Sequence, residues 1–374
     1  MENCFYETSW LVHSIPKLTA SFAALLTPPS THEQVRHRYQ LSTHADTFRD
    51  TLSHARPHYE YEEEKEKLGV LRQCKWTRLG GDASETAQAD YAGRKRKRAD
   101  SVMDGSLDQG ILISLVYEKT TYRFVLYTTN INAAKRSRSL PWAQSCSRSQ
   151  KPTAVLLSKS SPSVLRSLTN YLYDTFAVDN IHPLQLPSTF IQGTLQRYLS
   201  SIYSSLETAS NSQQGRVQDT FINVISTVKV HIAFSAPVAP HLKSLEVAIA
   251  PYAVLKAMPE NGNSGKDYFM GAISSYIHAN TGLILPVADE EEGSDDGRHA
   301  IEADSPKPEP PMKISRISNA AYAISCDHRL KFVLRAVDAV HGSDSPEENC
   351  VRRANQEVLD AVVEEAARQA ADDG

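Results

Sequence analysis

Two β-rich runs in the middle of the chain lie so close together that they can pair only as an antiparallel hairpin. Ile111–Tyr117 and Tyr122–Thr129 are rich in β-branched and aromatic residues, and only the short segment Glu118–Thr121 joins them. Parallel strands need a crossover of a dozen or more residues, which this link cannot supply. Any fold of this sequence must therefore contain antiparallel sheet.

Helical patterns interrupt further strand patterns along the chain. Apolar residues recur at helical spacing after Pro162 and again after Pro187 and Ser188, where proline and serine are typical of helix starts. Hairpins interrupted by helices predict an α+β fold, largely antiparallel sheet with hairpins and packed helices, and with disordered insertions. Further strands are predicted at Phe5–Ile15, Val224–Ser235, Leu245–Ile249, Ile314–Ile324 and Leu330–Arg335, and further helices at His44–Leu52, Lys266–Thr281 and from Pro346 onward.

Composition shifts divide the 374 residues into six predicted segments. A strand and helix region (1–79) precedes a polar insertion (80–109) and a central α+β core (110–287). An acidic, proline-rich linker (288–311) then leads to a C-terminal hairpin (312–343) and an amphipathic end helix (344–374). The apolar stripe of that helix is predicted either to pack on its own domain or to dock on a partner; it comprises Val351, Val358, Leu359, Val362 and Ala366.

Charge is segregated along the chain although the net charge is only −4. Asp289–Glu309 carries net −7 and Asp344–Gly374 carries net −6, which leaves +9 for the remainder. Within that remainder, the 55 residues of Lys119–Tyr173 contain no Asp or Glu. Such a stretch either attracts polyanions or is a solvated basic loop. The residues predicted to contact DNA phosphates are Lys135, Arg136, Arg138, Arg148 and Lys151.

A run of five basic residues lies inside the polar insertion, and it is typical of a nuclear import signal recognised by importin. Its residues are Arg94, Lys95, Arg96, Lys97 and Arg98. The alternative is a generic basic loop. Serines that precede proline are candidate phosphorylation sites at Ser161, Ser305 and Ser345.

Motifs that would indicate enzymatic chemistry are missing. Gly262–Lys266 is similar to the end of a phosphate-binding loop, but Asp267 stands where that motif needs Ser or Thr. The histidines and the five widely spaced cysteines show no metal-ligand spacing. We therefore expect no catalytic residues, no metal and no cofactor. An apolar run long enough for a membrane span and a signal peptide are also missing, which predicts an intracellular protein.

Several segments in the same order resemble the centromere protein L family of fungi, which are subunits of the inner kinetochore. The resemblance rests on Phe5–Ile15, His44–Asp50, Gly110–Tyr127, Pro183–Ser188, Leu242–Ile249 and Met312–Phe332. One departure is Ser53–Gln109, where the family pattern implies a strand containing Gly and Arg, while this chain has an acidic run and the basic insertion.

The resemblance implies a non-catalytic scaffold in the nucleus, at the centromere and kinetochore. Its implied partners are a centromere protein N-like subunit, other inner-kinetochore subunits, and the centromeric nucleosome with its DNA. By position in the family, Ile314–Arg335 is the implied pairing edge, with Ile314, Ile317, Leu330, Phe332 and Leu334 as pairing candidates. The alternative is an independent nuclear nucleic-acid-binding protein, such as an RNA-processing or chromatin factor.

Overall fold

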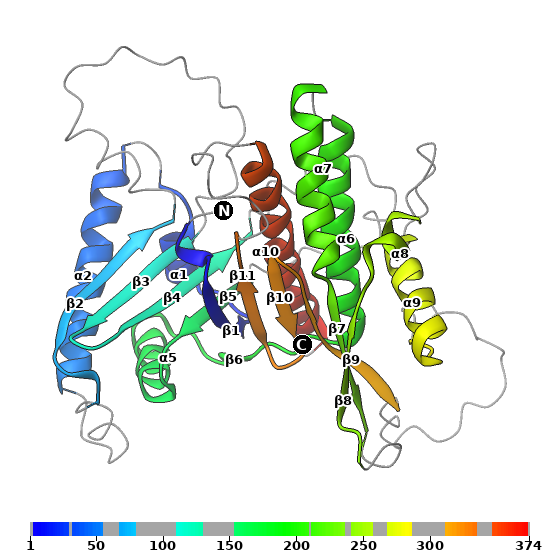
Figure 1. Ribbon diagram of the computed structural model, residues 1–374. Helices are drawn as coiled ribbons and strands as arrows, with labels where there is room; N and C mark the ends of the chain where they lie inside the picture. Colours follow the sequence, from blue (N-terminus) through cyan, green and yellow to red (C-terminus); the bar gives the residue numbers. More distant parts are fainter. Residues whose placement is uncertain are drawn as a thin grey trace, which may run out of the picture. The chain divides into compact units, whose positions relative to one another are not determined.

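The computed structural model describes residues 3–29, 32–54, 67–79, 110–129, 153–208, 211–235, 241–256, 268–285, 311–334 and 346–372. The chain divides into two compact units: residues 1–184 with 359–374 form unit 1, and residues 185–358 form unit 2. Both units combine helices with antiparallel strands (Figure 1). The predicted α+β fold class is therefore confirmed.

Unit 1 is built on a sheet with the strand order β2-β3-β4-β5-β1. Every neighbouring pair in it is antiparallel, and the short strand β6 adds to β1. The predicted hairpin is confirmed as β3 and β4, which pair from Gly110 with Tyr127 to Val116 with Thr121. The strands are β1 (Thr8–Ile15), β2 (Leu71–Arg78), β3 (Gly110–Tyr117), β4 (Thr121–Thr128), β5 (Ala154–Lys159) and β6 (His182–Pro183).

Helices pack on one face of this sheet and close the core of unit 1. They are α1 (Ala20–Leu26), α2 (Gln34–His54) and α5 (Pro162–Phe176), and a short 3-10 helix, η1 (Asn3–Phe5), precedes β1. Alternate sheet residues such as Ile113 and Phe124 share this core with Phe48 of α2 and Leu168 of α5. The ring of Tyr171 lies 5.2 Å from that of Phe48 and 5.9 Å from that of Trp76. Burying one large apolar side chain stabilises the folded state by about 2 kcal/mol or more. This cluster is therefore a main source of stability.

Unit 2 contains a run of neighbouring antiparallel strands in the order β11-β10-β9-β7-β8. Its strands are β7 (Lys229–Phe234), β8 (Ser244–Ala248), β9 (Met312–Ser318), β10 (Tyr322–Ser325) and β11 (Arg329–Phe332). Its helices are α6 (Ser188–Thr208), α7 (Asn211–Ser226), α8 (Pro251–Leu255) and α9 (Tyr268–Thr281). Gly282 ends α9 with a positive φ of 74°, as expected of a glycine C-cap.

The chain passes from unit 2 into unit 1 within its last helix, α10 (Pro346–Asp372). In unit 2, Glu347 lies 3.6 Å from Arg216 of α7. In unit 1, Tyr127 Oη donates a 2.7 Å hydrogen bond to Asp360. The whole predicted apolar stripe is buried, so α10 packs within its own chain rather than leaving that stripe for a partner.

Two predicted elements were wrong at their boundaries. The strand predicted at Val224–Ser235 begins only at Lys229, because α7 continues to Ser226. Val217, Phe221 and Val224 of α7 are all buried, and their helical spacing outweighs the short alternation that follows. The helix predicted at His44–Leu52 begins ten residues earlier, at Gln34, since Leu41 and Ala45 extend its buried stripe.

Two further differences concern strands. The predicted last hairpin is a three-stranded meander, because a turn divides its first arm after Ser318. There the Asn319 side chain accepts hydrogen bonds from the backbone N–H groups of Ala321 and Tyr322. Within Ser53–Gln109, where the sequence departs from the family pattern, the structure has a strand that we did not predict, β2, which contains Arg72 and Arg78 and follows Gly69.

Candidate polyanion-binding face

The unit 2 sheet has one buried face and one face that carries basic side chains. In β7, Val230 and Ile232 are fully buried, while Lys229 is exposed and His231 is half-buried. In β11, Leu330 and Phe332 are buried, while Arg329 is exposed and Lys331 is half-buried. Successive side chains of a strand point to opposite faces, so these cations share the face away from the core.

A β-bulge in β9 adds two more cations to that face. Residues three apart in a regular strand point to opposite sides, but Lys313 and Arg316 are both exposed. The register against β7 shifts between His231 and Ile232, so Ser315 is the extra residue of the bulge. The Ser315 hydroxyl donates a 3.2 Å hydrogen bond to the backbone carbonyl of His231. The bulge thus turns Arg316 outward beside His231.

Strand register brings these cations together across the sheet. Arg316 lies opposite His231 on one side and opposite Ser325 on the other, and Ser325 in turn lies opposite Arg329. A second row runs through Lys331, Ala323, Ser318 and Lys229. The Ala and Ser side chains between the cations are short, so they do not project beyond the Lys and Arg side chains. We call this surface the basic face and define it by Lys229, His231, Lys313, Arg316, Arg329 and Lys331.

One carboxylate, Glu246 of β8, lies at the border of the basic face. Its Oε1 is 2.7 Å from Lys229 Nζ, and its Oε2 is 3.3 Å from His231 Nε2. The hydrogen bond from Lys229, together with the charges of Lys229, His231 and Arg316, lowers the pKa of Glu246. Glu246 therefore stays ionised and occupies the position that a bound phosphate would take beside the same cations.

The basic face has the chemistry of a phosphate-contacting surface. The five Lys and Arg residues of this face favour a positive potential, which attracts a polyanion and releases its counterions on binding. Contacts of this kind position a nucleic acid without reading its bases. A sheet face with short Ala and Ser side chains between its cations can approach a phosphate backbone, whereas reading a major groove typically requires an inserted helix or β-ribbon.

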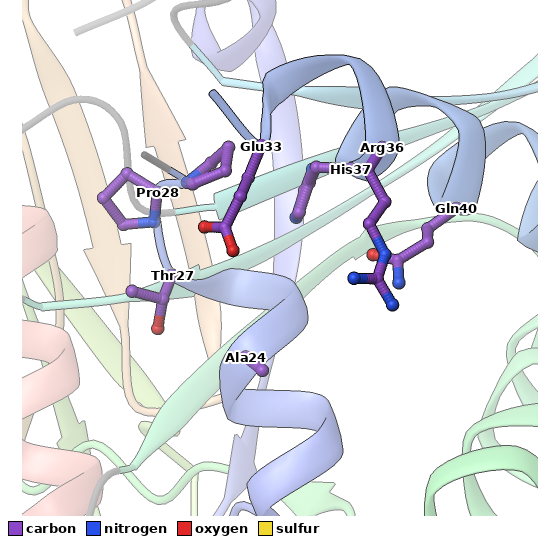
Figure 2. A pocket seen from close by; sticks show the side chains of 8 residues that line it. Ala24, Thr27, Pro28, Glu33, Arg36, His37 and Gln40 are labelled. Atoms are coloured by element: carbon purple, nitrogen blue, oxygen red, sulfur yellow. The ribbon is translucent and has the colours of Figure 1, made fainter. Parts of the chain in front are cut away.

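A pocket of about 350 Å³ lies elsewhere, in unit 1, between the end of α1 and the start of α2 (Figure 2). Burial lowers the pKa of His37, whose Nε2 is 2.9 Å from the carbonyl of Leu25. The hydroxyl of Thr27, the only one in the lining, donates to the carbonyl of Ala23 at 2.7 Å. The lining therefore lacks a nucleophile activated by a base. It consists of Ala24, Thr27, Pro28, Pro29, Glu33, Arg36, His37 and Gln40.

Metal binding, membrane insertion and thiol reactivity are three further properties of the part of the chain that the structure describes. Within it, no cluster of three or more His, Cys, Asp or Glu side chains could hold a metal ion. Its helices include none with the length and apolar character needed to cross a membrane. Burial raises the pKa of Cys74 to about 12 and also raises the pKa of Cys326 and Cys350, so these three thiols are poor nucleophiles.

The sequence-predicted sites fall into two groups, those outside the described residues and those on the strands of unit 2. The five predicted phosphate contacts, Lys135 to Lys151, and the basic run Arg94–Arg98 fall outside the described residues. Among the pairing candidates, Ile314, Ile317, Leu330 and Phe332 are fully buried in unit 2, and Leu334 is half-buried. Strands β9 and β10 each pair on both sides. Their backbone groups are therefore already used within the sheet.

The basic face itself was missed from the sequence. The signal was present, because Lys229 and His231 alternate with Val230 and Ile232, and Lys331 lies between Leu330 and Phe332. What the sequence does not reveal is that β7 and β9, which are separated by about eighty residues, lie next to each other in register.

The fold and the basic face together define a class: an α+β protein in two units with a basic sheet face. Comparison with known families then gives the identification. The model of the centromere protein L family matches residues 4–367, nearly the whole chain, and this chain belongs to that family. The family is one of structural kinetochore proteins, so the chain is a centromere and kinetochore subunit. No curated protein matches the sequence.

Proposed function

We propose that this chain is a non-catalytic scaffold of the inner kinetochore that helps to hold centromeric DNA, and that the basic face provides phosphate contacts. The observation that carries the proposal is the presence of Lys229, Arg316 and Arg329 on one sheet face, from strands β7, β9 and β11, with Glu246 paired to Lys229 at the border. Contacts to the DNA backbone suit a subunit that must hold centromeric DNA without reading its sequence. The predicted loop contacts Lys135, Arg136, Arg138, Arg148 and Lys151 would add to the same charge.

The proposal includes a centromere protein N-like partner, as the family resemblance implies. Within unit 2, β8 pairs only with β7 among the described strands. Its other edge offers backbone groups to which a partner strand can add. Since β9 and β10 are paired on both sides, β8 is a better pairing edge than the segment Ile314–Arg335 predicted from the sequence.

The remaining parts of the proposal concern location and assembly. Importin recognition of Arg94–Arg98 would carry the chain into the nucleus, where it would join other inner-kinetochore subunits at the centromeric nucleosome. Support comes from the basic run itself and from the family match over residues 4–367.

The test is affinity purification of the tagged chain from dividing cells, with mass spectrometry of the proteins that co-purify. We expect centromere components, including an N-like subunit, and DNA binding that is weak for the isolated chain and stronger for the pair. Recovery of RNA-processing factors, together with tight nucleic-acid binding by the isolated chain, would instead support an independent nucleic-acid-binding protein. The basic face alone would favour that function. Recovery without any centromere component would refute the scaffold proposal.

A further inference from the structure

The outward side of α2 in unit 1 carries an unusually apolar surface for a solvent-facing helix. The opposite side of the helix is buried against the sheet and α5, through Leu41, Phe48 and Leu52. On the outward side, Val35 and Tyr39 are 82% and 74% exposed. Single exposed apolar residues are ordinary, but these two lie one helical turn apart and begin a longer stripe.

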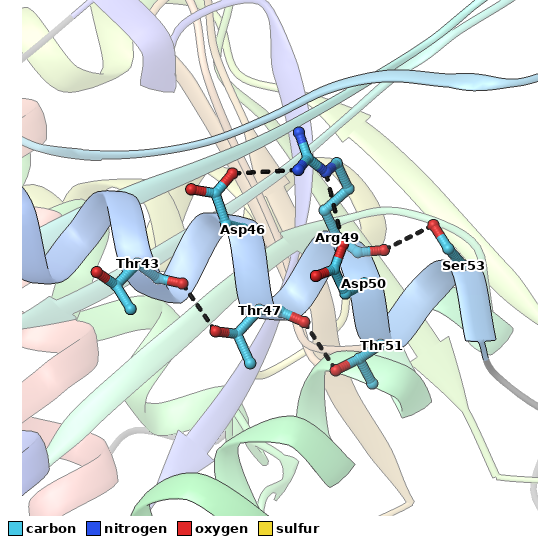
Figure 3. Close-up of polar contacts among 7 residues, drawn as sticks. All are labelled: Thr43, Asp46, Thr47, Arg49, Asp50, Thr51 and Ser53. Atoms are coloured by element: carbon cyan, nitrogen blue, oxygen red, sulfur yellow. Dashed lines mark hydrogen bonds and ion pairs between the residues drawn. The ribbon is translucent and has the colours of Figure 1, made fainter.

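Three threonines continue that stripe, and their hydroxyl groups are turned back onto the helix. Thr43 donates to the carbonyl of Tyr39 at 3.0 Å. Figure 3 shows the next two bonds, from Thr47 to the carbonyl of Thr43 and from Thr51 to that of Thr47, each at 2.9 Å. The hydroxyls are therefore already hydrogen-bonded within α2. Covering these side chains would leave no hydroxyl unsatisfied, so the stripe can be buried like an apolar one.

Two of the charges that border the stripe, Arg36 and Asp50, lie symmetrically about Thr43, while Asp46 and Arg49 pair with each other within α2 at 3.4 Å. Arg36, Tyr39, Thr43, Thr47 and Asp50 follow one another in steps of three, four, four and three residues, which is the spacing of a single helix face. An arginine begins this face and an aspartate ends it, at equal distances from Thr43. Arg36 is exposed, and the Asp50 side chain is 66% exposed although Arg49 lies 3.9 Å away. The face is thus complementary to itself in the antiparallel orientation.

We infer that α2 is a self-association surface that packs antiparallel against α2 of a second copy of this chain, about a two-fold axis through Thr43. Arg36 then faces Asp50 of the other copy, Tyr39 faces Thr47, and Thr43 faces its own equivalent. An isologous interface requires this reciprocal pattern. A single helix face buries less than the roughly 800 Å² per partner of a stable complex, so the dimer is weak and forms where copies are concentrated. The inference does not depend on the proposed DNA contact.

Charge reversal tests this arrangement in the full-length chain. Sedimentation equilibrium over a concentration series up to roughly 0.5 mM should give a monomer–dimer equilibrium for the unaltered chain. Arg36→Asp and Asp50→Arg should each weaken association about tenfold, because each creates two like-charge pairs across the two-fold axis. The double variant Arg36→Asp/Asp50→Arg should restore it, since the opposite charges again face each other.

Controls separate this surface from general charge effects and from misfolding. Lys17→Asp makes the same charge change as Arg36→Asp at an exposed site outside α2, and it should leave association unchanged. Circular dichroism should show equal helix content for all variants. A chain that stays monomeric at the highest concentration, or a double variant no better than the single ones, would overturn the inference.

A cysteine at the two-fold axis gives an independent readout. Thr43→Cys should form a disulfide with the same residue of the second copy under mild oxidation, because equivalent atoms approach each other only at such an axis. Peptide mass spectrometry should recover a cross-link between two identical peptides. In mixed oxidation, a Thr47→Cys copy should cross-link more readily with a Tyr39→Cys copy than with another Thr47→Cys copy, because Tyr39 faces Thr47 in the antiparallel arrangement. A parallel or unrelated contact would give the reverse order and contradict the antiparallel arrangement.

Discussion

Neutralising three cations of the basic face should flatten the salt dependence of DNA binding. The perturbation is Lys313→Gln, Arg316→Gln and Arg329→Gln together, at three exposed positions of β9 and β11. Glutamine keeps a polar side chain of similar reach, so the sheet should remain folded. The change removes three of the five Lys and Arg charges that the face presents.

The expected magnitude follows from counterion release. Each phosphate contact contributes about 0.9 to the slope of log K against log salt concentration, so three contacts contribute about 2.7. Between about 50 and 200 mM salt, those contacts alone account for a loss of roughly 40-fold in affinity. The variant should therefore bind more weakly than the unaltered chain at low salt, and the difference should shrink by about that factor at the higher concentration.

The assay is fluorescence anisotropy with a labelled duplex of about 30 base pairs, titrated at four or more salt concentrations. A matched control, Lys17→Gln with Lys67→Gln and Lys256→Gln, removes the same charge at exposed positions away from the basic face. Equal slopes for the two triple variants would mean that binding reflects overall charge and would refute the assignment. Duplexes of shuffled sequence should bind equally well, because phosphate contacts carry no base information.

Four further predictions test separate contacts. Glu246→Gln should tighten DNA binding several-fold in the same anisotropy assay, because a carboxylate that competes with phosphate for Lys229 and His231 is removed. Phe48→Ala should destabilise the protein by about 3–5 kcal/mol in urea unfolding, whereas Tyr173→Ala, at a 60% exposed position, should change stability by less than about 1 kcal/mol. Tyr127→Phe should cost about 1.5–3 kcal/mol in the same experiment, since it removes the donor to Asp360. At pH 8, Cys74 of the folded protein should react with iodoacetamide up to about a thousandfold more slowly than the same thiol in urea, because burial raises its pKa to about 12. Peptide mass spectrometry measures the rate.

Elements defined by local signals could be predicted from the sequence. The β3–β4 hairpin needs only a short link between two β-rich runs, and α5 and α6 begin at the proline and serine signals. The N-terminal part of α10 likewise follows Pro346 with Glu347 and Glu348 in its first turn. In each case the residues that determine the element lie within a few positions of one another.

Elements that depend on distant partners could not be predicted in this way. β2 has only one buried side chain, Trp76, yet it forms a strand because seven of its residues pair with β3 across an intervening segment of more than thirty residues. α7 begins with polar residues, and its helix is stabilised by tertiary packing, as in the contact of Phe221 with Tyr203 and Phe269 at 6.1 and 6.0 Å. Tertiary packing overrides weak local propensity in both cases.

The contrast between local signals and distant contacts also explains why charge counted along the sequence did not reveal the basic face. That count located Lys119–Tyr173, where basic residues lie close together in sequence, but the cations of the basic face occur on three strands spread between Lys229 and Lys331. Even within Lys119–Tyr173, pairing of β4 with β5 sets Arg123 directly opposite Lys159, on the sheet face away from α2 and α5. Like charges opposite each other weaken a strand pair by a few tenths of a kcal/mol or more, and a bound anion would remove that cost. Strand register in unit 2 therefore gathers positive charge on one sheet face, a feature that the total charge of −4 does not reveal.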